Sequence, residues 1–341
     1  MDTEKNAAYY KGLIVTTIKF KPADAPAGSK VTFNEKDKNG SVAVFLKNII
    51  KVNDTDKSGK REFEATVVSA EEAKEICEIG HGSGKCTPLF SLHGFNLEPG
   101  EILESDYGVF GTTSTSDMSY YPVPVIWASE GNTLLYTKDQ GNAFAAGLAL
   151  QAFVDFIPND IFPRKSLLLH SMGNHVVFNG ACLNKAPDVK FENIFMVAAD
   201  VPYDIFNEKP KNRFFFTKQN KMTYGYKKVK AENFFQMLET NSDGKPKGKI
   251  YILWNSRDLA LRASFLVNRE HRLGKVGAGW VDGFFSNGRS MSVIRDKYRP
   301  YIENLNATRK KISDKLLNHS YELESWAAEY YEEKLNLVVQ E

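Results

Sequence analysis

The stretch Leu167–Gly180 reads LLLHSMGNHVVFNG and places a serine, Ser171, at an abrupt change of local pattern. The apolar segment just before it, SLLLH at 166–170, is typical of a buried parallel strand. Beyond it the pattern turns helical near Gly173. A serine at such a strand-to-helix corner is expected to present its hydroxyl to a cleft, with the free N–H groups of the helix behind it.

Composition narrows the class of protein before any further motif is considered. The chain has 341 residues, of which 42% are hydrophobic and 25% charged, so it has enough apolar side chains for a sizeable core. A net charge of +2 does not favour nucleic acid as a partner. Three cysteines do not make a disulfide framework, and the N-terminus does not resemble a signal peptide. We therefore expect a cytoplasmic protein with no integral membrane segment.

From residue 88 onward, short apolar runs alternate with longer helical patterns, which favours βαβ units and a mostly parallel sheet with helices on both faces. Residues 1–85 are predicted to form an irregular, β-containing extension packed on the main domain. That domain is expected to span 86–341, with a cap insertion near 203–247. We expect strands at 88–95, 123–129, 166–170, 193–199, 249–255 and 290–296. We expect helices at 70–77, 138–157, 174–183, 231–239, 259–267 and 322–338.

The corner at Ser171 matches most of the nucleophile-elbow pattern G-x-S-x-G, in which a strained turn exposes a reactive serine. Gly173 occupies the second glycine position, whereas Leu169 stands at the first. A serine that only caps a helix would also fit the corner. A catalytic serine needs a base to accept its proton and an acid to orient that base, so the rest of the chain should supply both.

The acid and the base are expected to follow the serine in that order. Asp258 comes directly after a late strand, and Asp200 follows the preceding strand, so both are candidates for the acid, with Asp258 favoured. Among the histidines, His271 and His319 come late enough. His271 lies among charged residues, whereas His319 lies in a loop before the final helix. We therefore predict His319 as the base for Ser171.

The oxyanion formed by attack on a carbonyl needs backbone N–H donors. One is expected from the residue after the nucleophile, Met172, and the other from the His-Gly loop after an earlier strand. In that loop the donor is predicted to be Phe95, with Asn96 as an alternative. His93 and His170 are expected to support the site by hydrogen bonding.

Two other patterns suggest different chemistry. The stretch 80–86 (GHGSGKC) resembles a phosphate loop but lacks the leading Gly and the final Ser or Thr, so a linker is favoured. The segment 209–239 mixes basic and aromatic residues. It fits a lid over an apolar or anionic substrate, a weak membrane-surface contact, or a solvated surface, which is favoured. No His/Cys/Asp/Glu cluster has metal-ligand spacing, so neither a metal nor another cofactor is predicted.

Five motifs occur in order along the chain, and together they resemble the DUF900 family of α/β-hydrolases, whose function is largely unassigned. The resemblance covers roughly residues 85–325, with Asn318 where the family has Gly and Leu169 where it has a small residue. It implies an α/β-hydrolase fold and hydrolytic activity, with an ester as the expected substrate. The motifs are HGFN at 93–96, WAS at 127–129, HSMGN at 170–174, DLAL at 258–261 and NHSY at 318–321.

The sequence therefore predicts a serine hydrolase, most specifically a carboxylesterase, that acts on a small-molecule ester with Ser171, His319 and Asp258. The alternative is a non-catalytic scaffold of the same fold that binds a ligand or a partner protein, with Leu169 distorting the corner.

Overall fold

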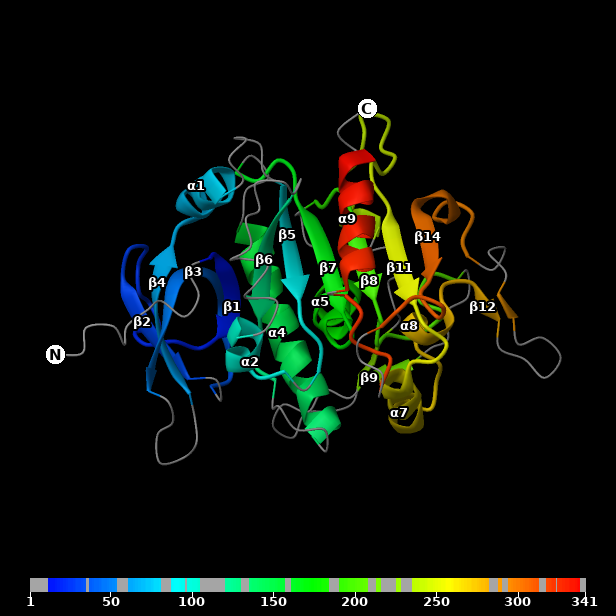
Figure 1. Cartoon of the computed structure of the whole chain (residues 1–341), viewed down its shortest axis with the longest axis horizontal. Coiled ribbons are helices and arrows are strands. Elements are labelled where there is room, and N and C mark those ends of the chain that lie inside the picture. The colour runs from blue at the N-terminus through cyan, green and yellow to red at the C-terminus, as the bar shows by residue number, and fades with distance from the viewer. Residues whose placement is uncertain are drawn as a thin grey trace. The chain divides into compact units, whose positions relative to one another are not determined.

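The computed structural model groups the chain into two compact units, Met1–Lys165 and Ser166–Glu341, here called the first and the second unit (Figure 1). The predicted domain boundary at residue 85 does not coincide with this division and stays a prediction. The structure describes residues 12–34, 37–53, 61–80, 87–95, 97–104, 120–129, 135–156, 161–183, 190–207, 213–215, 225–227, 235–281, 288–289, 294–312, 317–322 and 324–337.

The first unit contains a mixed sheet with strand order β5-β6-β1-β3-β4-β2. β5, β6 and β1 are parallel, whereas β3 pairs antiparallel with β1 and β4, and β4 with β2. Residues before 70 are therefore more regular than expected. The strands are β1 (Ile14–Ile18), β2 (Lys30–Asn34), β3 (Asn39–Asn53), β4 (Glu62–Val68), β5 (Thr87–Leu92) and β6 (Tyr120–Ile126). The helices are α1 (Ala70–Gly80), α2 (Pro99–Glu104) and α4 (Tyr136–Phe156).

Two prolines, Pro122 and Pro124, lie inside β6 although this strand pairs on both sides. Proline has no N–H to donate, so it is normally excluded from a central strand. Pairing between β6 and β1 involves only Val125 and Ile126, beyond both prolines. The prolines therefore interrupt no pairing with β1.

The second unit contains a fully parallel sheet with strand order β14-β11-β8-β7. β7, β8 and β11 are buried along their whole length, as expected for parallel strands covered on both faces. The strands are β7 (Ser166–His170), β8 (Ile194–Val197), β11 (Ile250–Trp254) and β14 (Ile302–Asn306). The helices are α5 (Gly173–Leu183), α7 (Leu259–Asn268), α8 (Leu273–Val276), the short 3-10 helix η4 (Arg299–Tyr301) and α9 (Ser325–Leu337).

Two further antiparallel pairs belong to the second unit: β9 (Arg213–Phe215) with β10 (Gly225–Lys227), and β12 (Trp280–Val281) with β13 (Gly288–Arg289). The first pair lies in the segment for which a cap was predicted. The rest of 208–234 lies outside the described residues, so the cap and its membrane contact stay predictions. The stretch 81–86 also lies outside the described residues.

Two predicted elements differ from the structure. Of the helix predicted at 231–239, residues 231–234 lie outside the described residues and residues 235–236 are helical. The helix ends earlier than predicted, because Leu238 forms an isolated bridge with Phe191. Of the strand predicted at 290–296, the first four residues lie outside the described residues, and Ile294 forms only an isolated bridge with Asn207. The edge strand beside β11 is β14, which the sequence did not predict.

The mixed, mostly parallel architecture confirms the predicted fold class. Parallel strands end at the same edge of their sheet, so side chains that follow them along the chain meet there. In the second unit Ser171 follows β7, Asp200 follows β8 and Asp258 follows β11.

Candidate active site

Ser171 lies at the corner between β7 and α5, with a backbone φ of 49°. This left-handed conformation is strained for a residue with a side chain and is characteristic of a nucleophile elbow. Hydrogen bonds hold the corner: the Ser171 N–H donates to the Val197 carbonyl (3.0 Å), and the Ser171 carbonyl accepts from the Asp200 N–H (3.2 Å). The strain is therefore maintained by the strand next to β7.

Asn174 reinforces the corner from the first turn of α5. Its side-chain Nδ2 donates to the carbonyls of Leu169 (2.8 Å) and Ser171 (3.0 Å). Leu169, at the position where the elbow pattern has Gly, is fully buried within β7. The sharp corner thus forms with a leucine at this position, and the Leu169 backbone takes part in holding it.

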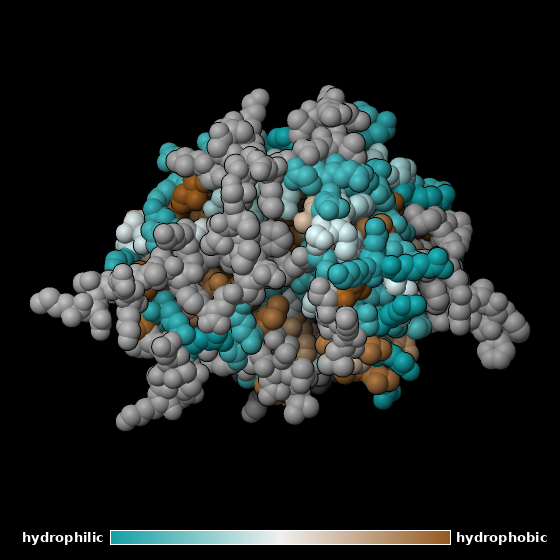
Figure 2. Space-filling view, in the orientation of Figure 1, coloured by the Kyte–Doolittle hydropathy of each residue, from teal (hydrophilic) through white to brown (hydrophobic). Residues whose placement is uncertain are grey.

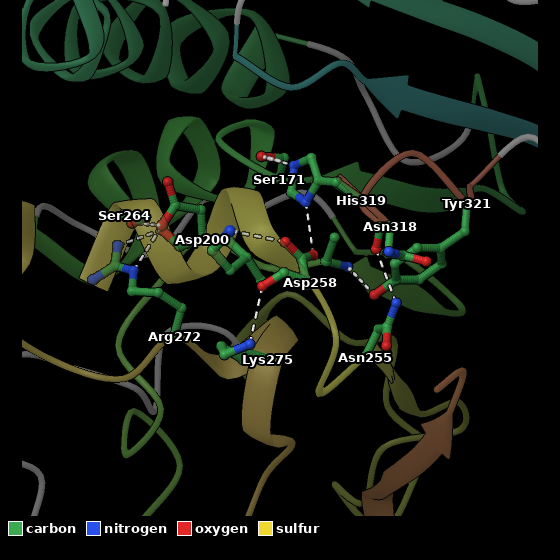
Figure 3. Close-up of polar contacts among 12 residues, drawn as sticks. Ser171, Asp200, Asn255, Asp258, Ser264, Arg272, Lys275, Asn318, His319 and Tyr321 are labelled. Carbon is green, nitrogen blue, oxygen red and sulfur yellow. Dashed lines mark hydrogen bonds and ion pairs between the residues drawn. The ribbon is translucent and has the colours of Figure 1, made fainter. Parts of the chain in front are cut away.

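His319 joins Ser171 and Asp258 in one hydrogen-bonded chain (Figure 3). Its Nε2 lies 2.7 Å from the Ser171 Oγ, and its Nδ1 lies 2.7 Å from the Asp258 Oδ2. An ionised carboxylate only accepts hydrogen bonds, so Nδ1 carries the proton of a neutral ring and Nε2 is left to accept the serine proton. All three side chains are buried.

Asp258 follows β11 and caps the N-terminus of α7. Its Oδ1 accepts from the Leu261 N–H at 2.8 Å, while Oδ2 faces His319. The Lys275 Nζ donates to the Asp258 backbone carbonyl at 2.9 Å. The bonds to Leu261 and His319 orient both oxygens of the carboxylate, and the Lys275 bond holds the Asp258 backbone.

Asp200, the alternative acid, has different partners. Its Oδ1 accepts from the Arg272 Nε and from the Ser264 Oγ, each at 2.6 Å (Figure 3). Arg272 is itself almost fully buried and also donates to the His175 Nε2 at 2.9 Å. Burial, the largest effect, lowers the pKa of His175 to about 4, so this ring stays neutral and accepts from the guanidinium. The geometry therefore favours Asp258 over Asp200 as the partner of His319.

The loop that carries His319 is tied to the ends of β8 and β11. The Tyr321 hydroxyl donates to the Leu253 carbonyl (3.0 Å) and accepts from the Ala198 N–H (3.1 Å). The Asn255 Nδ2 donates to the carbonyl of Asn318, which has a φ of 52°. Asparagine tolerates this left-handed conformation better than most residues, which accounts for its presence where the related motif has glycine.

A second buried pair lies beside this chain. The His170 Nδ1 is 3.1 Å from the Glu322 Oε1, and both side chains are almost fully buried. The His170 Nε2 is 3.4 Å from the His319 carbonyl, and the two imidazole rings are 5.0 Å apart between centroids. Sequence reasoning missed Glu322. The sequence feature that could have identified Glu322 is its position three residues after His319, the predicted base.

Burial by itself lowers the pKa of His319, but nearby carboxylates outweigh this effect and hold its pKa above the ordinary value. Asp258 contributes most of the increase, followed by Glu322 and Asp200. The surroundings therefore favour a proton on His319, as is required of a base that becomes positively charged during a reaction.

Two predicted site residues, His93 and Phe95, belong to the first unit. The His93 Nε2 accepts from the Trp127 N–H at 3.2 Å, and the His93 ring stacks on the Trp127 indole at 5.0 Å. Burial lowers the pKa of His93 to about 4, which keeps the ring a neutral acceptor. Phe95 packs edge-on against Tyr136, and Asn96 lies outside the described residues. Their roles in a site stay predictions.

His271, the other candidate base, packs against the rings of Tyr203 and Phe265. Met172, the predicted oxyanion donor, is buried directly before α5. Among the described residues, no group of three or more His, Cys, Asp or Glu side chains is placed to hold a metal ion. None of the helices in the described part of the chain has the length and apolar character needed to traverse a bilayer.

The α/β-hydrolase class is defined by a mostly parallel sheet and a strand-to-helix corner that carries a serine. That serine is hydrogen-bonded to a histidine, which is in turn hydrogen-bonded to an aspartate. The chain belongs to the family described as "Alpha/beta hydrolase of unknown function (DUF900)", which matches residues 70–328. This match confirms the family resemblance. No curated protein and no solved structure matches the chain.

Proposed function

We propose that this protein is a serine hydrolase, and specifically a carboxylesterase with Ser171, His319 and Asp258 as its catalytic triad. The observation that carries the proposal is the pair of 2.7 Å contacts made by the two nitrogens of His319, one with a serine hydroxyl and one with a carboxylate. Strain at Ser171 supports the same role, because strained backbone is concentrated at functional sites.

In the proposed reaction the Ser171 Oγ attacks the acyl carbon of an ester while its proton passes to the His319 Nε2. The tetrahedral intermediate collapses, the bond to the alcohol oxygen breaks, and His319 returns the proton to the leaving alcohol. Water then attacks the acyl-enzyme with His319 again as the base, which releases the acid and restores Ser171. Asp258 stays ionised throughout and stabilises the imidazolium.

The negative oxygen of the intermediate needs donors that are in place before attack. We assign this role to the backbone N–H groups of Met172 and Phe95. Met172 directly follows the nucleophile and precedes α5, where backbone N–H groups and the helix dipole favour negative charge. The proposed reaction needs only a small-molecule ester and water.

A non-catalytic scaffold is the competing function, because the sequence has Leu169 where the elbow pattern has a small residue, although the corner forms with this leucine in place. A fluorophosphonate probe, which reacts with activated serines, separates the two functions. We expect the wild-type protein to be labelled and the Ser171→Ala variant to lose labelling completely. Ser166→Ala is a matched control, because Ser166 is a buried serine at the other end of β7. A folded wild-type protein that stays unlabelled would identify a scaffold.

A further inference from the structure

The surface of α7 exposes an unusual amount of apolar side chain. Seven large hydrophobic residues are exposed in the described part of the chain, and four of them lie on or beside this helix. They are Leu259 (44% exposed), Leu266 (73%), Val267 (51%) and Leu317 (42%). An isolated exposed leucine needs no explanation, but a cluster of this kind indicates a contact surface.

These four side chains form one surface. Leu259 and Leu266 are seven residues apart, so they lie on the same side of the helix two turns apart. Leu317 lies next to Leu259, whose N–H donates to the Leu317 carbonyl at 2.9 Å. Brown surface gathers at the lower right of Figure 2, over the place where Figure 1 shows α7. We use the name α7 face for the surface formed by Leu259, Leu266, Val267 and Leu317 together with Arg257, Arg262 and Arg269.

Positive charge surrounds the apolar residues. Arg257, Arg262 and Arg269 are exposed along or just beside α7. Arg309, Lys310 and Lys311 are also exposed and lie beside this helix start, because Thr308 makes hydrogen bonds with Ser256.

Among the residues that the structure describes, the acidic side chains next to this surface are already engaged. Asp258 is fully buried against His319, and Glu270 lies 3.2 Å from the Arg272 guanidinium. Between residues 256 and 269, the exposed charges on α7 and its two ends are therefore all positive.

An apolar helix face ringed by arginines matches the chemistry of an anionic lipid surface. Leucine and valine side chains would enter the acyl boundary, while long arginine stems would let their charged ends reach the headgroups. Each cation near an anionic lipid surface adds attraction wherever it lies. A protein partner would instead need acidic side chains placed opposite these cations.

The α7 face is also close to the candidate active site. Asp258 is the residue directly before α7, and Leu317 precedes His319 by two positions. In the second unit α7 lies beyond the carboxyl end of β11, the edge at which Ser171, His319 and Asp258 meet (Figure 1).

We propose that the α7 face docks on anionic lipid surfaces, and that the site draws its ester substrates from the lipid. The substrate half of this inference rests on the proposed hydrolase function, whereas the docking half does not.

The docking half is tested by co-sedimentation of the full-length Ser171→Ala protein with vesicles of phosphatidylcholine, alone or mixed with phosphatidylserine. We expect binding to the mixed vesicles. The double variant Leu266→Glu/Val267→Glu should weaken it by about tenfold or more, because carboxylates replace the inserted side chains. Arg262→Gln and Arg269→Gln should each weaken it about fivefold.

Leu148→Glu is the matched control, because Leu148 is as exposed as Leu317 but belongs to α4 in the first unit. This variant should bind like its parent. Absence of binding to the mixed vesicles would overturn the proposal. So would binding that the α7 substitutions leave unchanged, or self-association through α7 detected by light scattering without vesicles.

The substrate half is tested with two esters, one soluble in water and one dissolved in the vesicles. On the wild-type background, Leu266→Glu/Val267→Glu should reduce turnover of the vesicle-borne ester while fluorophosphonate labelling and turnover of the soluble ester stay unchanged. Equal loss on both esters would overturn the substrate half. Absence of labelling together with intact vesicle binding would overturn the proposed function but leave the docking surface standing.

Discussion

Asp258 uses its two carboxylate oxygens for two different tasks. Oδ1 caps α7 through the Leu261 N–H, and Oδ2 holds the His319 Nδ1. A single residue thereby fixes the start of a helix and the tautomer of the proposed base. Replacing Asp by Asn keeps a good helix cap but replaces the charge that faces the ring.

We therefore expect Asp258→Asn to fold normally and to lower kcat on p-nitrophenyl esters by about a thousandfold or more, because the His319 tautomer and the imidazolium lose their support. Steady-state kinetics together with a thermal melt test this expectation.

Asp200→Asn is the comparison for that variant. Asp200 balances the buried charge of Arg272, so its loss should lower stability by about 3 kcal/mol or more. Activity per folded molecule should fall much less than in Asp258→Asn. The reverse order of the two kcat values would assign the acid to Asp200.

Glu322 affects His319 through charge. Its carboxylate helps to hold the pKa of His319 above the ordinary value, although burial opposes this effect. The base acts in its neutral form, so the acidic limb of kcat/KM should report this raised pKa. Removing the charge in Glu322→Gln should move that limb to lower pH.

A pH profile of kcat/KM measures the shift, with Glu329→Gln as the control because Glu329 is exposed on α9. If Glu322→Gln lowers activity but leaves the acidic limb of the pH profile at the same pH, Glu322 acts only as a structural partner of His170. A moved limb identifies it as a positioning residue that acts through charge.

At the scale of elements, the loop between β14 and α9 decides whether His319 reaches Ser171. Hydrogen bonds anchor this loop to Asn255 and Leu259, and Asn318 turns it through a φ of 52°. Local backbone conformation and the position of the base are therefore coupled.

We expect Asn318→Val to cost about 1–3 kcal/mol, because a β-branched residue is strained at positive φ. It should also slow fluorophosphonate labelling of Ser171. Asn318→Gly should keep both properties near wild type, since glycine adopts this conformation freely. Thermal melts and labelling rates check both variants, and equal tolerance of valine and glycine would contradict the coupling.

Five strands were predicted because their side chains are buried on both faces and read as largely apolar runs, namely β5, β6, β7, β8 and β11. β14 was missed because it is an edge strand that pairs with β11 and has only two apolar residues, Ile302 and Leu305, among its five. The helix predicted at 231–239 is helical at residues 235–236 but ends before its predicted last residue. Its apolar spacing continues to Leu238, which forms a bridge with Phe191 instead of extending the helix.

At the scale of the whole molecule, burial keeps a histidine neutral in the described part of each unit, His93 in the first and His175 in the second. The pKa values of His93 and His175 fall from the ordinary 6.5 to about 4. The unfolded chain takes up protons at these histidines below pH 6.5, whereas the folded chain does so only near pH 4. The free energy of unfolding should therefore decrease as the pH falls through this window.

Each of these histidines should contribute up to about 3 kcal/mol to the decrease. His319 acts in the opposite direction, because its raised folded pKa favours the folded state below that value. Urea unfolding at several pH values between about 4 and about 7.5 measures the slope. His93→Gln and His175→Gln should each flatten it, and a slope unchanged in both variants would contradict the expectation.

The sequence by itself determined the local features: the strand-to-helix corner at Ser171, the Asp after β11, the late loop histidine and the α/β fold class. Each depends on residues that are neighbours along the chain, where periodicity and turn chemistry act directly. Only the tertiary structure decided that Asp258 faces His319 while Asp200 pairs with Arg272, and that Glu322 lies against His170. These pairings join residues far apart in sequence, or side chains whose direction depends on packing, so no local pattern specifies them.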